Sequence, residues 1–147
     1  MAAEPTAALE REVWIAARPE VVFACFTDPA LLVRWKGVEA TLEPVPGGVY
    51  RVVMNARDVV RGEFVELVPH SRIVFTWGFE GEAGLLPAGA STVEVTLTPD
   101  RDGTLVRLIH RGLPAGVQEA HARGWDHHLG RLQLAAAGHD AGPDDRA

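Results

Sequence analysis

Hydrophobic and polar residues alternate with a period of two through the middle of the chain, a pattern typical of half-buried antiparallel strands. Turn residues interrupt this alternation, as at Pro46-Gly47-Gly48 and Asp100-Arg101-Asp102-Gly103. With an N-terminal apolar segment, the pattern predicts seven strands, over 10–16, 39–44, 49–54, 59–68, 72–79, 91–98 and 104–111. In 59–68 neither the odd-numbered nor the even-numbered positions carry more of the large apolar groups. The sequence therefore does not indicate which face of this strand is buried.

Helical patterns lie on both sides of the last six strands. Pro19 suits the first turn of a helix, and apolar residues recur behind it up to Phe26. Asp28 can cap, and Pro29 can open, a second short helix over 30–35. A long helix is expected over 117–137, before a left-handed cap at Gly138.

The long helix carries one apolar stripe, because His121, Trp125, Leu129 and Leu132 recur at helical spacing. Gly124 interrupts this helix, as does Gly130, and each glycine costs about 1 kcal/mol relative to alanine. We expect a close approach of the helix to the sheet or to the short helices to compensate for this cost.

The segment 80–90 is rich in glycine and small residues, so it is predicted to be a long connection. Leu85-Leu86 lies near its centre. Two interpretations are open: the leucines are exposed on a mobile lid or partner contact, or they fold back onto the core.

The length of 147 residues and the apolar share of 47% fit a single domain, expected over 10–137. Residues 1–9 and the polar tail 138–147 are expected to be disordered. A net charge of −6 without a basic run argues against nucleic acid and anionic membrane surfaces as partners. No segment reaches the roughly 20 apolar residues of a membrane span. The start of the chain lacks signal-peptide features, and the lone Cys25 fits a reducing compartment, so a cytoplasmic location is expected.

Four segments, in order, resemble the START-like (SRPBCC) superfamily, in its branch of homologues of the activator of the heat-shock protein 90 ATPase. They are Thr27-Asp28-Pro29 with Leu32 and Trp35; Glu43-Pro44 to Gly47-Gly48 and Tyr50; Gly62 to Pro69 and Trp77; and Gly103-Thr104, His110, Gly112-Leu113, Gly124-Trp125, Leu129 and Leu132. The resemblance implies an α+β helix-grip fold, in which a seven-stranded antiparallel sheet curls around the C-terminal helix. Such domains commonly hold an apolar cavity between sheet and helix.

Strand parity indicates which side chains face that cavity. Ile73, Phe75 and Trp77 share one face, as do Val93, Val95 and Leu97, and the register of the family adds Val106, Leu108 and His110. The residues predicted to contact a ligand are Trp35, Tyr50, Phe75, Trp77, Val95, Leu97, Leu108, His110, His121, Trp125 and Leu129. The alternative for the tryptophans is packing in the core.

The two histidines of this set allow two readings. Either His110 or His121 orients a ligand or acts as an acid or base, or each is hydrogen-bonded within the core. Tyr50, Arg51 and Glu66 are weaker candidates for the orienting role, and surface salt bridges explain the two charged residues equally well.

Metal, cofactor and nucleophilic chemistry are not expected. His127 and His128 are adjacent and point about 100° apart on a helix, and no HExxH motif accompanies them. Cys25 lies among apolar residues and is interpreted as a small core residue.

The leading hypothesis is therefore the binding of a small hydrophobic molecule, lipid-like or polyketide-like, rather than catalysis. The alternatives are a cyclase-like or hydrolase-like enzyme that uses a cavity histidine, and a stimulator of a chaperone ATPase. An exposed first strand, or the Leu85-Leu86 loop, is a candidate contact for a homodimer.

Overall fold

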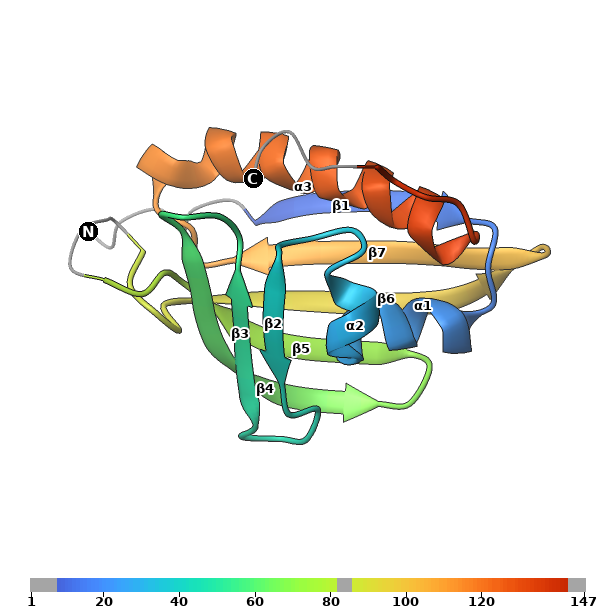
Figure 1. The fold of residues 1–147 in the computed structure, drawn as a ribbon, viewed down its shortest axis with the longest axis horizontal. Helices are drawn as coiled ribbons and strands as arrows, with labels where there is room; N and C mark the ends of the chain where they lie inside the picture. The colour runs from blue at the N-terminus through green and yellow to red at the C-terminus, as the bar shows by residue number, and fades with distance from the viewer. Residues whose placement is uncertain (1–7, 82–85, 143–147) are drawn as a thin grey trace, which may run out of the picture.

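Figure 1 shows a computed structural model in which a long helix lies along one side of a curved antiparallel sheet. The structure describes residues 8–81 and 86–142. Its elements are β1 (Leu9–Ile15), α1 (Pro19–Thr27), α2 (Pro29–Leu32), β2 (Glu39–Leu42), β3 (Val49–Val53), β4 (Val59–Val68), β5 (Arg72–Trp77), β6 (Ser91–Asp100), β7 (Gly103–Arg111) and α3 (Ala115–Ala136).

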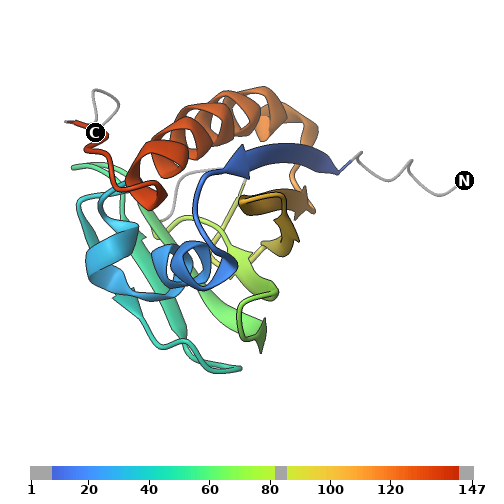
Figure 2. The same cartoon turned by 90° about the vertical axis from the view of Figure 1, so that its right-hand side faces the viewer.

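The described residues form seven strands in the order β1-β7-β6-β5-β4-β3-β2. From β2 to β7 each strand pairs with the next strand in the chain, whereas β1 pairs with β7, with Leu9 opposite His110 and Ile15 opposite Thr104. In the view of Figure 2 the sheet curls below α3, with α1 and α2 covering one end. The predicted α+β helix-grip fold is confirmed.

The core lies between the sheet and α3, on the faces that strand parity predicts. Ile73, Phe75 and Trp77 of β5 are at most 5% exposed, and so are the predicted residues of β6 and β7. The α3 stripe is also confirmed, because Trp125, Leu129 and Leu132 are buried and His121 is half-buried.

The structure of β4 explains why its sequence shows no regular alternation of buried and exposed positions. Val60 and Phe64 are buried, but the register with β5 shifts between Phe64 and Glu66, which is a β-bulge. A bulge inserts one extra residue and moves the following side chains to the other face. Leu67, of the opposite parity, therefore packs against the core while Val68 is exposed.

Several element boundaries differ from the predictions. The second helix ends at Leu32 rather than at residue 35, because the chain tightens into short turn hydrogen bonds and reaches Gly37 with a φ of 81°. Strand β5 ends at Trp77 rather than at residue 79, and Phe79 forms only isolated bridges. Strand β6 runs on to Asp100 rather than ending at residue 98, and α3 begins at Ala115 rather than at residue 117.

The connection after β5 folds back onto the core where the structure describes it. Leu86 is 3% exposed, and its carbonyl accepts a hydrogen bond from the Phe79 amide at 3.0 Å. Of the two interpretations of the leucines, inward packing onto the core is therefore correct for Leu86. Leu85 lies outside the described residues.

Both ends of the domain differ from the expected disorder where they are described. Leu9 already belongs to β1. Beyond α3, Gly138 has the predicted left-handed conformation, with a φ of 88°. The Arg131 guanidinium then donates hydrogen bonds to the carbonyls of Ala141 and Gly142, which holds this part of the tail against the helix. Residues 1–7 and 143–147 lie outside the described ranges.

Candidate functional site

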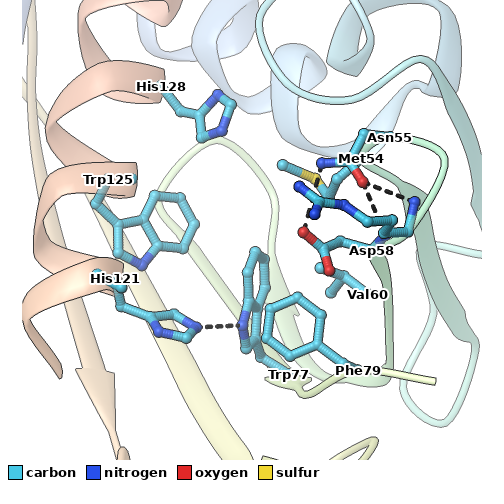
Figure 3. A pocket seen from close by; sticks show the side chains of 12 residues that line it. Met54, Asn55, Asp58, Val60, Trp77, Phe79, His121, Trp125 and His128 are labelled. Carbon is cyan, nitrogen blue, oxygen red and sulfur yellow. Dashed lines mark hydrogen bonds between the residues drawn. The ribbon is translucent and has the colours of Figure 1, made fainter. Parts of the chain in front are cut away.

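A pocket of about 320 Å³ opens between α3, the end of β5 and the turn between β3 and β4. In Figure 3, His121, Trp125 and His128 reach into it from successive turns of α3, and Trp77 and Phe79 face them. The pocket is lined by Met54, Asn55, Arg57, Asp58, Val60, Trp77, Phe79, Ala120, His121, Gly124, Trp125 and His128.

The apolar part of this lining is aromatic. The rings of Trp77 and Trp125 have centroids 5.3 Å apart and are tilted by 43°, and Phe79 meets Trp77 edge-on at 6.3 Å. Such surfaces favour flat apolar groups, which gain both burial and contact with the ring faces. The polar part lies at the turn, where the Asn55 side chain accepts hydrogen bonds from the backbone amides of Arg57 and Asp58.

His121 is half-buried, and both of its ring nitrogens have partners. Nδ1 lies 2.9 Å from the Val117 carbonyl oxygen, so it carries the proton and donates a hydrogen bond to that oxygen. Nε2 accepts a hydrogen bond from the Trp77 indole N–H at 3.2 Å, the dashed line of Figure 3. Burial lowers the pKa of His121 below its ordinary value of 6.5. The ring is therefore a neutral acceptor that fixes the orientation of Trp77.

His110 belongs to a hydrogen-bond chain that crosses the core below the pocket. The Trp125 indole N–H donates to His110 Nδ1 at 3.0 Å, which leaves Nε2 as the protonated nitrogen that faces Ser91 Oγ at 2.8 Å. The Ser91 hydroxyl in turn donates to the Trp77 carbonyl at 2.7 Å. Burial lowers the pKa of His110 to about 3. This histidine is neutral, and its hydrogen bonds hold Trp125 in place.

Lys36 lies under the aromatic wall, a position that the sequence analysis missed. It is 1% exposed, and its Nζ is 2.7 Å from the Tyr50 hydroxyl. The same nitrogen is 4.1 Å from the Trp77 ring centroid and 4.7 Å from that of Trp125. Burial lowers the pKa of Lys36 well below its ordinary value.

Three of the predicted ligand contacts line the pocket: Trp77, His121 and Trp125. The other eight are at most 3% exposed in the core outside the pocket lining: Trp35, Tyr50, Phe75, Val95, Leu97, Leu108, His110 and Leu129. Among the tryptophans, core packing therefore describes Trp35, and elsewhere in this group Tyr50 stacks on Phe75 with centroids 4.1 Å apart.

The weaker candidates Arg51 and Glu66 belong to surface salt bridges with partners of their own. Arg51 pairs with Glu80 at 2.8 Å, and Glu66 pairs with Arg72 at 2.5 Å. Cys25 is 4% exposed, and burial raises the pKa of its thiol to about 11, which fits the interpretation as a core residue.

The sequence predicts that close packing of the helix compensates the cost of Gly124, but the structure shows no such packing. A β-carbon at Gly124 would meet nothing within 4 Å, and the same holds for Gly130. Gly124 lines the pocket between the turns that carry His121 and Trp125. Its missing side chain therefore leaves pocket space open.

Neither a metal site nor a membrane span is found in residues 8–81 and 86–142. They contain no group of three or more histidine, cysteine or acidic side chains placed to hold a metal ion. They also contain no helix that is both long enough and apolar enough to span a membrane.

The curled sheet, the long C-terminal helix and the pocket between them define a helix-grip domain of the START-like (SRPBCC) superfamily. Comparison with protein families narrows this class. Residues 16–137 match the family described as "Activator of Hsp90 ATPase homolog 1-like protein", and the chain belongs to this family.

Relatives agree with this assignment. A human protein, "Activator of 90 kDa heat shock protein ATPase homolog 1", is 30% identical over 122 residues, which cover 82% of this chain and 34% of the relative. The chain thus spans about one third of the length of the curated relatives it matches.

Solved structures of relatives share the fold. An AHSA1-like protein from Rhizobium etli is 45% identical, with a TM-score of 0.75 over 96% of this chain and 88% of that chain. An HSP90 activator from Plasmodium falciparum is 26% identical, with a TM-score of 0.74 over 88% of this chain and 95% of that chain.

Proposed function

We propose that this domain binds a small apolar or aromatic molecule in the pocket between α3 and the sheet. The observation that carries the proposal is the pair of indoles, Trp77 and Trp125, which border open space beside Gly124. Burial of an aromatic ligand against two rings stabilises the complex by about 25 cal/mol for each Å² of apolar surface removed from water. The polar groups at the rim, Asp58 among them, orient the ligand.

The volume sets the size of the ligand. The pocket, at about 320 Å³, lies at the lower end of the range of roughly 300–1,000 Å³ found for small-molecule sites. A compound of one or two fused rings fits this volume better than a long-chain lipid or a large polyketide. The preferred ligands are accordingly small, flat aromatic compounds.

The hydrogen bonds of the two histidines favour binding over histidine catalysis. A general acid or base needs a ring nitrogen that can reach the substrate. In His110 both nitrogens are engaged within the core, and in His121 they are engaged by the Val117 carbonyl and the Trp77 indole. Both rings therefore support the aromatic wall.

Titration of the intrinsic tryptophan fluorescence with naphthalene and indole derivatives tests the proposal. Gly124→Leu places a side chain in the pocket and should abolish saturable quenching. Gly130→Leu is the matched control, because Gly130 is exposed on the same helix with nothing within 4 Å of a β-carbon, and it should bind normally. Equal binding by the two variants would place any bound ligand elsewhere, and no binding by the unmodified protein would refute the proposal.

Stimulation of a chaperone ATPase is the second candidate, favoured by family membership. The family takes its description from an activator of the Hsp90 ATPase, and the relative from Plasmodium falciparum is an HSP90 activator. We propose a direct test, in which ATP hydrolysis by an Hsp90 from the same cell is measured with and without the domain. No change at a several-fold molar excess would dismiss this candidate.

Self-association is a separate proposal. A structural neighbour, 19% identical, is an Aha1 dimer from Colwellia psychrerythraea. Sedimentation equilibrium of this domain distinguishes a monomer from a homodimer directly.

A further inference from the structure

Two side chains of opposite charge line the pocket at the turn between β3 and β4. They belong to Arg57 and Asp58, which are neighbours in the chain and are both exposed. In Figure 3, Asp58 lies across the pocket from Trp125 and His128 of α3. The pocket therefore presents a guanidinium and a carboxylate on one side and an aromatic wall on the other.

Neither charge forms an ion pair within the part of the chain that the structure describes. There, the Arg57 guanidinium forms no salt bridge, and only the backbone amide of this residue is hydrogen-bonded. The Asp58 carboxylate accepts one long hydrogen bond, at 3.4 Å, from the Asn55 side-chain amide. Arg51 of the adjacent β3, by contrast, pairs with Glu80 at 2.8 Å. Both pocket charges are therefore available to a ligand.

The turn holds these two charges side by side. Asn55 Oδ1 accepts hydrogen bonds from the backbone amides of Arg57 and Asp58, at 2.9 and 2.8 Å. The Asp58 carbonyl accepts another from the Met54 amide, at 2.9 Å. These bonds fix the backbone of both residues, whose Cα atoms are about 3.8 Å apart. A ligand with an ammonium and a carboxylate on one carbon can therefore meet both side chains.

The other polar side chains of the pocket already have partners at the atoms that could serve this role. Both ring nitrogens of His121 are engaged, by the Val117 carbonyl and the Trp77 indole. His128 Nδ1 lies 3.2 Å from the Trp35 carbonyl oxygen. Recognition of a charged ligand therefore falls to the turn, where a guanidinium can hold a carboxylate with two parallel hydrogen bonds.

We propose that the ligand is an aromatic zwitterion, with its ring on Trp77 and Trp125, its carboxylate on Arg57 and its ammonium on Asp58. Aromatic amino acids have this chemistry. The proposal rests on the proposed function, because the ring occupies the same pocket, and it adds the charges by which the site selects among aromatic compounds.

The paired charges favour a zwitterion over a compound with one charge. A carboxylate alone would gain Arg57 but would lie near Asp58, and an ammonium alone would gain Asp58 but would lie near Arg57. The whole chain has a net charge of −6, which disfavours the approach of anions. A zwitterion has no net charge and satisfies both side chains at once.

Four compounds with the same ring test this proposal by isothermal titration calorimetry. Indole has no charge, indole-3-acetate adds the carboxylate, tryptamine adds the ammonium, and tryptophan has both. An exposed ion pair contributes about threefold in affinity, so we expect tryptophan to bind about tenfold more tightly than indole, with the other two compounds between them. Sodium chloride should reduce this difference, because exposed charges are screened. Equal affinities of tryptophan and indole would overturn the proposal.

Two variants assign the charges to their residues. Arg57→Gln should remove the preference for tryptophan over tryptamine, and Asp58→Asn should remove the preference for tryptophan over indole-3-acetate. The matched controls are Arg34→Gln and Asp102→Asn, which remove the same charges at exposed positions outside the pocket and should keep both preferences. Preferences that persist in the two pocket variants would contradict the assignment and overturn the proposal.

This proposal and the proposed function fail in different ways. Indole, which has no charge, reports only on the aromatic wall. Binding of indole with no gain for tryptophan overturns the zwitterion and leaves the proposed function intact. Saturable binding of tryptophan without binding of indole supports the charged pair and contradicts the proposed function.

Discussion

Replacement of Lys36 by methionine tests the protonation state of the buried amine through stability. Methionine keeps an unbranched chain of similar length and removes the titrating group. In the folded protein, burial lowers the pKa of Lys36 well below its ordinary value. In the unfolded chain the amine keeps a pKa near 10.4. Between these two pKa values the unfolded state binds one more proton, so the free energy of unfolding rises as the pH rises.

The magnitude follows from this linkage. One proton contributes about 1.4 kcal/mol for each pH unit, so the stability of the natural protein relative to Lys36→Met should rise with a slope of up to about 1.4 kcal/mol per pH unit between the folded and the unfolded pKa. The variant also leaves the Tyr50 hydroxyl without its partner, at a cost of about 1–3 kcal/mol. That cost does not depend on pH in this window, so it shifts the difference without changing its slope.

Urea unfolding followed by far-ultraviolet circular dichroism at four pH values measures the slope. Burial raises the pKa of Cys25 to about 11, which lowers stability as the pH rises above the ordinary thiol pKa. Because both proteins contain Cys25, this contribution cancels in the difference. Parallel stability curves would show that Lys36 has the same charge in both states. That result would refute the reasoning.

Three further predictions concern the wall of the pocket. Ser91→Ala removes the hydroxyl that bonds to two buried groups and should lower the free energy of unfolding by about 1–3 kcal/mol in urea, whereas Ser71→Ala, at a more exposed hydroxyl, should change it by less than about 0.5 kcal/mol. Gly124→Ala and Gly130→Ala should each raise the melting temperature, because alanine favours the helix by about 1 kcal/mol, but only Gly124→Ala should weaken ligand binding; equal affinities would contradict the placement of the ligand. His121 should lower stability as the pH falls below about 6.5, since burial lowers its folded pKa and the unfolded chain takes the proton first; His121→Phe should make the acid dependence shallower and leave the part due to His110, whose pKa burial lowers to about 3, and an unchanged dependence would disprove the contribution of His121.

The fold follows from features that the sequence displays locally. Strand parity identified the buried faces of β5 and β6, because every second residue there is large and apolar. It failed in β4, where the bulge after Phe64 reverses the parity partway along the strand. A bulge depends on pairing with the neighbouring strand, so the sequence of β4 alone does not reveal it.

The site was less predictable, because its main features depend on empty space and on distant partners. Lys36 follows a short helix, and a lysine is usually a surface residue. Only the assembled fold brings Tyr50 and two indoles around it. The sequence predicts a close contact at Gly124, whereas the structure places open space there. Trp125 is predictable because it lies on a regular apolar stripe.

The pairing of β1 with β7 has a consequence for synthesis of the chain. Leu9 pairs with His110, so the first strand of the domain has no partner until β7, the last strand of the domain, has been made. At about 5–20 residues per second, the roughly 100 residues between them take several seconds or more to synthesise. Strands β2 to β7 pair with their neighbours as they emerge, whereas β1 closes the sheet only at the end. The first strand of the domain thus joins the sheet last, and within this domain its unpaired edge needs protection for the longest time.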